Sequence, residues 1–147
     1  MTPDLTFVPG ELLREPYLYR GPGPSTVGRG LFAIDPKPFG APFVPAENQD
    51  GSAEAMPGVG STVDGVDMMS AGPRDTIVIH PDDAPSLEPH PDDSRQAGCC
   101  GPFGDRGPNR VCACGAEVAA LMADCYGPHE LHLYPDRVAA DGADQAP

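Results

Sequence analysis

The residues of this chain best suited to chemistry are its five cysteines, which all fall within residues 99–125. The preceding 98 residues contain none. Cysteines that serve only as small hydrophobic residues would not gather in one segment, so we expect these five to share a local task. Thiolates are preferred ligands of Zn²⁺, which binds four ligands tetrahedrally. The candidate metal ligands are Cys99, Cys100, Cys112, Cys114 and Cys125.

The spacing of these cysteines predicts a zinc-ribbon-like site. A glycine directly follows both Cys100 and Cys114. Glycine accepts the left-handed conformation, which lets backbone N–H groups point at a thiolate. The cysteine pairs are spaced C-C and C-x-C instead of the usual C-x2-C. Because adjacent cysteines reach one metal only with a distorted backbone, one of Cys99 and Cys100 can be the spare fifth cysteine, and the choice of four ligands stays open.

Two histidines follow the last cysteine, in His129-Glu-Leu-His132. One reading makes either histidine a substitute for a cysteine ligand. The other reading places them on a strand, where positions 129 and 132 point to opposite faces. The segment also lacks the H-E-x-x-H spacing that puts two histidines on one face of a helix. We favour the second reading.

A further motif, Ile79-His-Pro-Asp-Asp83, resembles the A-H-P-D-D-E opening of the LmbE/PIG-L family of zinc-dependent deacetylases. The resemblance implies that His80 and Asp83 bind zinc and that Asp82 acts as the base. Ala84 stands where the family has an acidic residue. The tetrapeptide recurs at residues 90–93, which favours turn chemistry by Asp and Pro. A metal-dependent hydrolase is therefore an alternative function, and a thiol redox sensor built on Cys99–Cys100 or on Cys112 and Cys114 is a third.

Composition restricts the class of partner. The formal net charge is −13, and neutralising nucleic-acid phosphates requires clustered Lys and Arg, so nucleic acid is an unfavoured partner. No apolar run approaches the length of a membrane span, and the N-terminus has neither a basic start nor an apolar stretch. We therefore expect a cytoplasmic protein with no membrane association. Thiols stay reduced there, which favours metal binding over disulfides.

The elements that must position these residues are expected to be mostly β, with a small α+β fold as the alternative. Eighteen glycines and 20 prolines indicate little packed material, so a zinc ion would help to stabilise a small core. We expect short antiparallel strands, a long irregular insert and a C-terminal zinc-ribbon-like module. The predicted regions are N-terminal strands at 1–20, a flexible Gly/Pro-rich insert at 21–73, a strand plus the module at 74–138, and a disordered tail at 139–147.

Individual strands are predicted from β-branched runs and from alternation. Thr76–Ile79 has the pattern of a buried strand, and residues 30–34 form the one strand expected inside the insert. Glu117–Asp124 can be helix or strand. Because turn residues separate it from the alternating stretch Glu130–Tyr134, we favour a hairpin.

One resemblance covers more of the chain, in residues 15–21, 75–84 and 99–138. These segments look like a family of small bacterial proteins that share a C-C-G-P-x-G…G-P-N…C…C-G…D-C pattern and have no assigned activity. The resemblance implies a compact unit. Together with the cysteine cluster, it leads us to expect a non-catalytic zinc-binding protein that acts as a binding or adaptor module for another protein.

Overall fold

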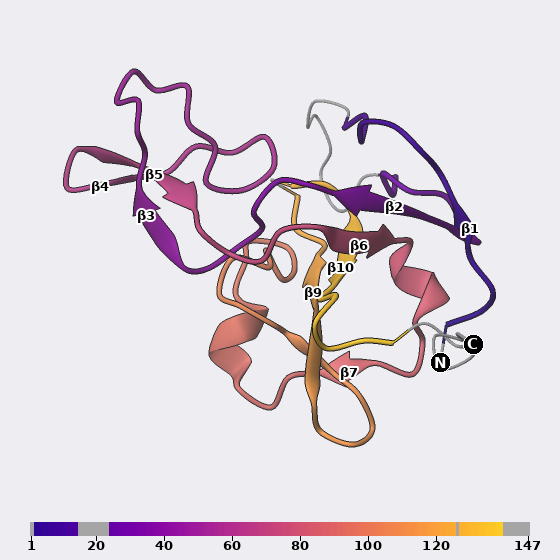
Figure 1. The fold of residues 1–147 in the computed structure, drawn as a ribbon. Helices are drawn as coiled ribbons and strands as arrows, with labels where there is room; N and C mark the ends of the chain where they lie inside the picture. Colours follow the sequence, from indigo (N-terminus) through magenta and orange to yellow (C-terminus); the bar gives the residue numbers. More distant parts are fainter. Residues whose placement is uncertain (1, 15–23, 126, 140–147) are drawn as a thin grey trace.

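The computed structural model describes residues 2–14, 24–125 and 127–139, and the fold is mostly β, as predicted (Figure 1). In this part of the chain the strands form two sheets. The larger sheet has the order β1-β2-β6-β10-β9-β8-β7. Its strands are β1 (Thr6–Phe7), β2 (Leu31–Asp35), β6 (Thr76–Ile79), β7 (Glu88–Pro89), β8 (Arg110–Val111), β9 (Glu117–Met122) and β10 (Glu130–Leu133). Its pairings are antiparallel except for β1 with β2, which is parallel.

The centre of the larger sheet is formed by β6, β10 and β9. The sequence predicted β6 and β10 as strands, and it left β9 open between helix and strand with a hairpin favoured. The β-branched run of β6 lies between β2 and β10, with Val78 and Ile79 fully buried. Strands β9 and β10 pair antiparallel, which confirms the predicted hairpin. Ala119 and Ala120 of β9 are also fully buried. Burial in the middle of a sheet therefore overrides the helix preference of alanine here.

The interval 21–73, expected to be an irregular insert with one strand, contains β2 and the whole smaller sheet. That sheet has the order β3-β5-β4, formed by β3 (Phe43–Pro45), β4 (Thr62–Val63) and β5 (Val66–Ser70). The turn between β4 and β5 is Asp64-Gly65, with φ values of 50° and 79°. Such a two-residue turn with positive φ at both positions matches the twist of a hairpin.

A few large side chains attach this glycine-rich region to the larger sheet. Phe39 and Met56 are 1% and 3% exposed, and they pack in one cluster with Met122 and Tyr134 of the C-terminal hairpin region. A second cluster forms around Ile79 and Leu131. A small number of apolar contacts thus packs the Gly/Pro-rich region against the larger sheet.

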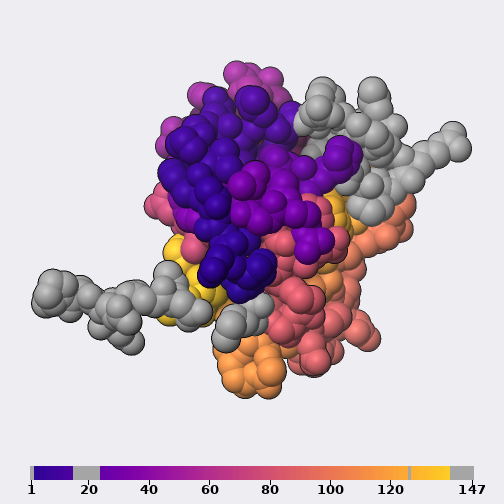
Figure 2. Space-filling model, turned by 90° about the vertical axis from the view of Figure 1, so that its right-hand side faces the viewer, coloured from indigo at the N-terminus to yellow at the C-terminus, as the bar shows by residue number. Residues whose placement is uncertain are grey.

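The remaining elements are short. Two 3₁₀ turns, η1 (Pro81–Asp83) and η2 (Asp93–Gln96), follow β6 and β7. The loop between β8 and β9 projects from one end of the molecule, as both views show in orange (Figures 1 and 2). The predicted N-terminal strands are represented by β1, because residues 15–20 lie outside the described part. The predicted tail also lies outside it, apart from Ala139.

Candidate metal centre

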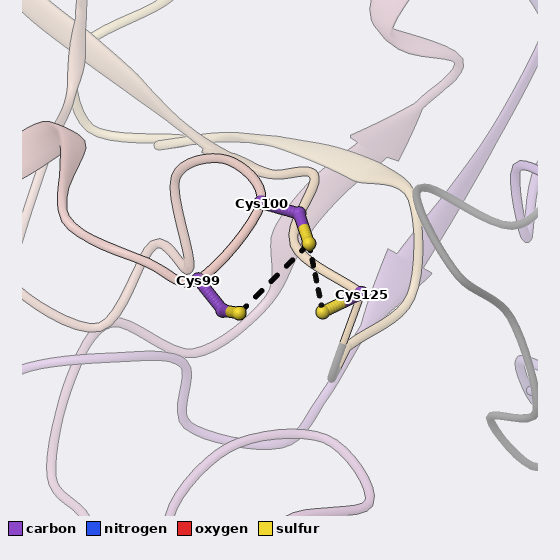
Figure 3. A group of neighbouring side chains, drawn as sticks. All are labelled: Cys99, Cys100 and Cys125. Carbon is purple, nitrogen blue, oxygen red and sulfur yellow. Dashed lines mark hydrogen bonds between the residues drawn. The ribbon is translucent and has the colours of Figure 1, made fainter.

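Three of the five cysteines meet at the surface of the protein (Figure 3). The sulfur atoms of Cys99, Cys100 and Cys125 all lie within 4.8 Å of one another. The Sγ of Cys100 is 3.9 Å from that of Cys99 and 3.2 Å from that of Cys125. Cys99 and Cys100 are exposed, and Cys125 is partly buried. In the described residues this is the only group of three or more potential ligands of these types close enough to hold one ion.

Two glycines allow the first two cysteines to reach this position. A Cβ at Gly98 would overlap the carbonyl oxygen of Gly101, and a Cβ at Gly101 would lie 2.7 Å from the carbonyl oxygen of Ala123. Real Cβ atoms do not approach oxygen so closely, so both positions require glycine. The glycine after Cys100 therefore serves close packing against the neighbouring chain and not the left-handed turn that the sequence suggested.

Backbone hydrogen bonds fasten the cysteine loop, residues 97–103, to the chain that carries Cys125. The N–H of Phe103 donates to Ala97 at 3.0 Å and closes the loop. The N–H of Ala123 donates to Pro102 at 2.8 Å. Cys125 follows β9 by three positions, so the central sheet holds one side of the cluster.

Asp124 makes the tightest connection between the two sides, and the sequence analysis did not select it. Its carboxylate accepts a 2.7 Å hydrogen bond from the N–H of Cys100, and Asp124 is 3% exposed. The same oxygen lies 3.8 Å from the Sγ of Cys125. In the sequence, Asp124 is distinguished only by its position directly before Cys125. A single Asp-Cys step does not predict a contact with Cys100, 24 residues away.

The spacing of the three sulfurs suits a tetrahedral thiolate site. Three sulfurs that each lie about 2.3 Å from one ion are about 3.8 Å apart in tetrahedral geometry. The separation of Cys99 and Cys100, 3.9 Å, already matches this value. The separation of Cys100 and Cys125, 3.2 Å, requires a small opening by side-chain rotation. Three cysteines can therefore hold a metal ion here and leave a fourth coordination position.

Without a metal, the cluster is held by hydrogen bonds between thiols. The hydrogen bond with Cys100, followed by partial burial and the hydrogen bond with Cys99, raises the pKa of Cys125 to about 12. A metal ion binds the thiolate, so binding would release this proton.

The other two cysteines are bonded to each other. Cys112 and Cys114 form a disulfide in the loop between β8 and β9, with their Cα atoms 5.2 Å apart. Gly115 has the predicted left-handed conformation with φ of 84°, and the N–H of Cys114 points at the Sγ of Cys112 at 3.2 Å. The local turn thus has the form expected for a thiolate ligand pair. The structure does not, however, bring this pair into the group formed by Cys99, Cys100 and Cys125.

The two histidines after Cys125 are also absent from that group, and they lie apart from each other. His132 is fully buried and bridges Thr76 and Glu130 through its two ring nitrogens, at 2.8 Å and 2.7 Å. His129 lies edge-on to His80, with ring centroids 6.0 Å apart. Neither histidine replaces a cysteine ligand in the observed arrangement.

The His-Pro-Asp-Asp motif forms a turn. The ring nitrogen Nδ1 of His80 accepts a 3.1 Å hydrogen bond from the N–H of Asp82, which caps η1. His90 makes the same contact with Asp92 at 2.9 Å in the second copy of the tetrapeptide. Asp83 is buried and binds the Arg29 guanidinium and the N–H of Gly30. These contacts confirm the turn chemistry and commit Asp83 to a structural ion pair.

Comparison with known proteins gave no match to a family model, to a curated protein or to a solved structure. No helix in the described residues is both long enough and apolar enough to cross a lipid bilayer. The function of the protein must therefore be inferred from the geometry of the site itself.

Proposed function

We propose that this protein is a non-catalytic zinc-binding module in which Cys99, Cys100 and Cys125 hold one Zn²⁺ ion. The observation that carries the proposal is the approach of these three sulfurs to within 4.8 Å of one another. They come from two segments that lie 24 residues apart and are joined by the hydrogen bond between Cys100 and Asp124. A bound ion would add three stronger links at the same place and would fix the shape of the cysteine loop.

The exposed position of the cluster supports a role in binding a partner. Three cysteines leave one of the four positions that zinc prefers, and Cys99 and Cys100 face solvent. In this proposal, a side chain of a partner protein or a water molecule completes the site. A protein suits this surface better than nucleic acid does, because the chain carries a net charge of −13. We place the module in the cytoplasm, where the three thiols stay reduced and where the Cys112–Cys114 disulfide of the structure would be open.

The resemblance to small bacterial proteins with a C-C-G-P…D-C pattern is consistent with this role, and membership of that family is part of the proposal. We do not propose the hydrolase, because Asp83 is committed to Arg29 and Gly30.

The direct test is the metal content of protein that is purified under reducing conditions without added zinc. We expect about one equivalent of zinc in the wild type. Cys125→Ser should reduce it to a small fraction, because two remaining thiols do not hold zinc firmly. Cys114→Ser is the matched control and should retain the wild-type content. Less than about half an equivalent in the wild type, or equal loss in both variants, would contradict the proposal.

A second candidate function is thiol redox sensing, which the 3.2 Å separation of the Cys100 and Cys125 sulfurs favours. In this reaction a peroxide accepts two electrons from the two thiols, the sulfurs form a disulfide, and the two protons leave in the water produced. Treating metal-free protein with mild peroxide should lower the number of titratable thiols by two, and a reductant should restore them. A thiol count that peroxide leaves unchanged would dismiss this candidate without affecting the zinc proposal.

A further inference from the structure

A pocket of about 510 Å³ lies away from the cysteines, between residues 46–57 and the ends of β2 and β6. Its size falls within the range of roughly 300–1,000 Å³ typical of small-molecule sites. Residues 46–57 form the loop that follows β3 of the smaller sheet, and Met69 and Ser70 of β5 also belong to the lining.

The pocket lining carries charges of both signs, on exposed side chains. Lys37, two residues after β2, and Arg74, two residues before β6, contribute cations. Glu47 and Glu54, on residues 46–57, contribute carboxylates. Within the described part of the chain, none of these four groups forms an ion pair, although each lines the same pocket. The opposite charges are therefore more than ion-pair distance apart, and a ligand that carries both charges can lie between them.

The pocket lining includes a third cation, which ion pairs hold in place. Arg14 lines the pocket and binds the buried carboxylates of Asp35 and Glu130, at 2.8 Å and 2.7 Å. Glu130 is in turn bound to the fully buried His132. Among the described residues, Nη1 of Arg14 has no partner. The ion pairs with Asp35 and Glu130 hold this guanidinium in a fixed orientation in the lining.

We infer that this pocket binds a small zwitterion of the amino-acid type. Its carboxylate would lie against Lys37 and Arg74, and its ammonium group against Glu47 and Glu54. An apolar side chain would contact the part of the lining that includes Met56 and Met69. The lining carries as many carboxylates as cations, and the whole chain is strongly acidic, so a simple anion gains less here than a molecule with both charges.

The test is calorimetric titration of the full chain with L-leucine and with two analogues that each lack one charge. N-acetyl-leucine keeps only the carboxylate, and leucine amide keeps only the ammonium group. We expect leucine to bind at least about tenfold more tightly than either analogue, because each analogue loses its interactions with one pair of charged groups. Phenylalanine and methionine extend the titration to other apolar side chains.

Variants locate the binding to this pocket. Lys37→Gln and Arg74→Gln should each weaken leucine binding by about tenfold, and Glu54→Gln should have a similar effect by removing a carboxylate. Arg106→Gln is the control, because this exposed guanidinium lies outside the pocket. Among the described residues it donates only to the Ser94 carbonyl, at 3.4 Å. Equal affinity for leucine and N-acetyl-leucine would overturn the inference. So would the absence of saturation by all three amino acids at about 10 mM, or equal weakening by Arg106→Gln.

Discussion

Two groups of polar side chains in this protein differ in almost every physical respect. The cysteine cluster (Cys99, Cys100 and Cys125) sits on loops at the surface. The buried charged network lies inside the larger sheet and consists of Arg14, Asp35, Thr76, Glu130 and His132. Glu130, His132 and Thr76 are fully buried, and Asp35 is 4% exposed.

The difference separates side chains that buried partners hold in place from side chains that can exchange their partners. Asp35, Thr76, Glu130 and His132 lie where water cannot replace a lost partner, so removing one of them leaves a neighbour uncompensated. The cysteine cluster faces solvent, and its hydrogen bonds are between weak thiol donors and acceptors. Its side chains can therefore change partners, from one another to a metal ion, without disturbing the sheet.

Removing one charge from the buried charged network should produce the largest effect. Glu130→Ala takes away the carboxylate that binds both Arg14 and His132, and it should lower the free energy of unfolding by about 3–5 kcal/mol. Urea denaturation measures this loss. Glu88→Ala, which removes an exposed carboxylate on β7, should change stability by less than about 0.5 kcal/mol. Equal effects of the two substitutions would show that the network adds nothing to the fold.

The pH dependence of the free energy of unfolding is a second, independent measure of what the buried charged network contributes to stability. Burial opposes ionisation of Glu130, but hydrogen bonds and charge from His132 and Arg14 outweigh it and lower the pKa to about 2 from an ordinary 4.5. Because the folded-state pKa is the lower one, the stabilisation is present above about pH 4.5 and is lost as the pH falls toward 2. The free energy of unfolding should thus decrease by a few kcal/mol across this interval.

The control for the pH experiment is Glu130→Gln, which removes the titrating group and keeps its shape. Its unfolding free energy should vary less between pH 5 and pH 3 than that of the wild type. Identical slopes for the two proteins would assign the acid sensitivity to other carboxyl groups.

The fold could be predicted where the sequence pattern is local. The β-branched run of β6 and the alternating pattern of β10 predicted these two strands correctly. The turn residues between β9 and β10 indicated their hairpin. The smaller sheet was missed because its strands contain few large apolar residues and are separated by glycine and proline. The Asp64-Gly65 pair is a typical two-residue hairpin turn, and it is the one feature of the sequence that could have predicted the β4–β5 hairpin.

The candidate site could be predicted only in part, for a related reason. Clustering in the sequence correctly drew attention to the cysteines, but it could not decide which of them meet. Cys125 joins Cys99 and Cys100 because the cysteine loop packs on the end of β9, which is a tertiary contact. The buried charged network was invisible for the same reason, since Arg14 and Glu130 are 116 residues apart.

Removing a metal should affect stability less than breaking the buried charged network. If zinc binds only the folded state, it adds about 2.7 kcal/mol when its free concentration is 100 times the dissociation constant. A chelator should therefore lower the melting temperature of the wild type and leave its far-ultraviolet circular dichroism at 25 °C that of a β protein. Cys125→Ser should show no response to zinc or chelator. Complete unfolding of the wild type on chelation would show that the metal, and not the sheet, holds the chain together.

Separating the two sets of cysteines should give the smallest effect and the sharpest test of the comparison. Cys112→Ser combined with Cys114→Ser removes a disulfide that closes a loop of very few residues, so it should cost at most about 1–2 kcal/mol. Zinc content should stay unchanged, because neither sulfur belongs to the cysteine cluster. Loss of zinc in this double variant, measured beside an intact wild-type control, would show that the metal-bound protein recruits the loop between β8 and β9. The site would then be a four-cysteine zinc ribbon and not a three-cysteine cluster open to a partner.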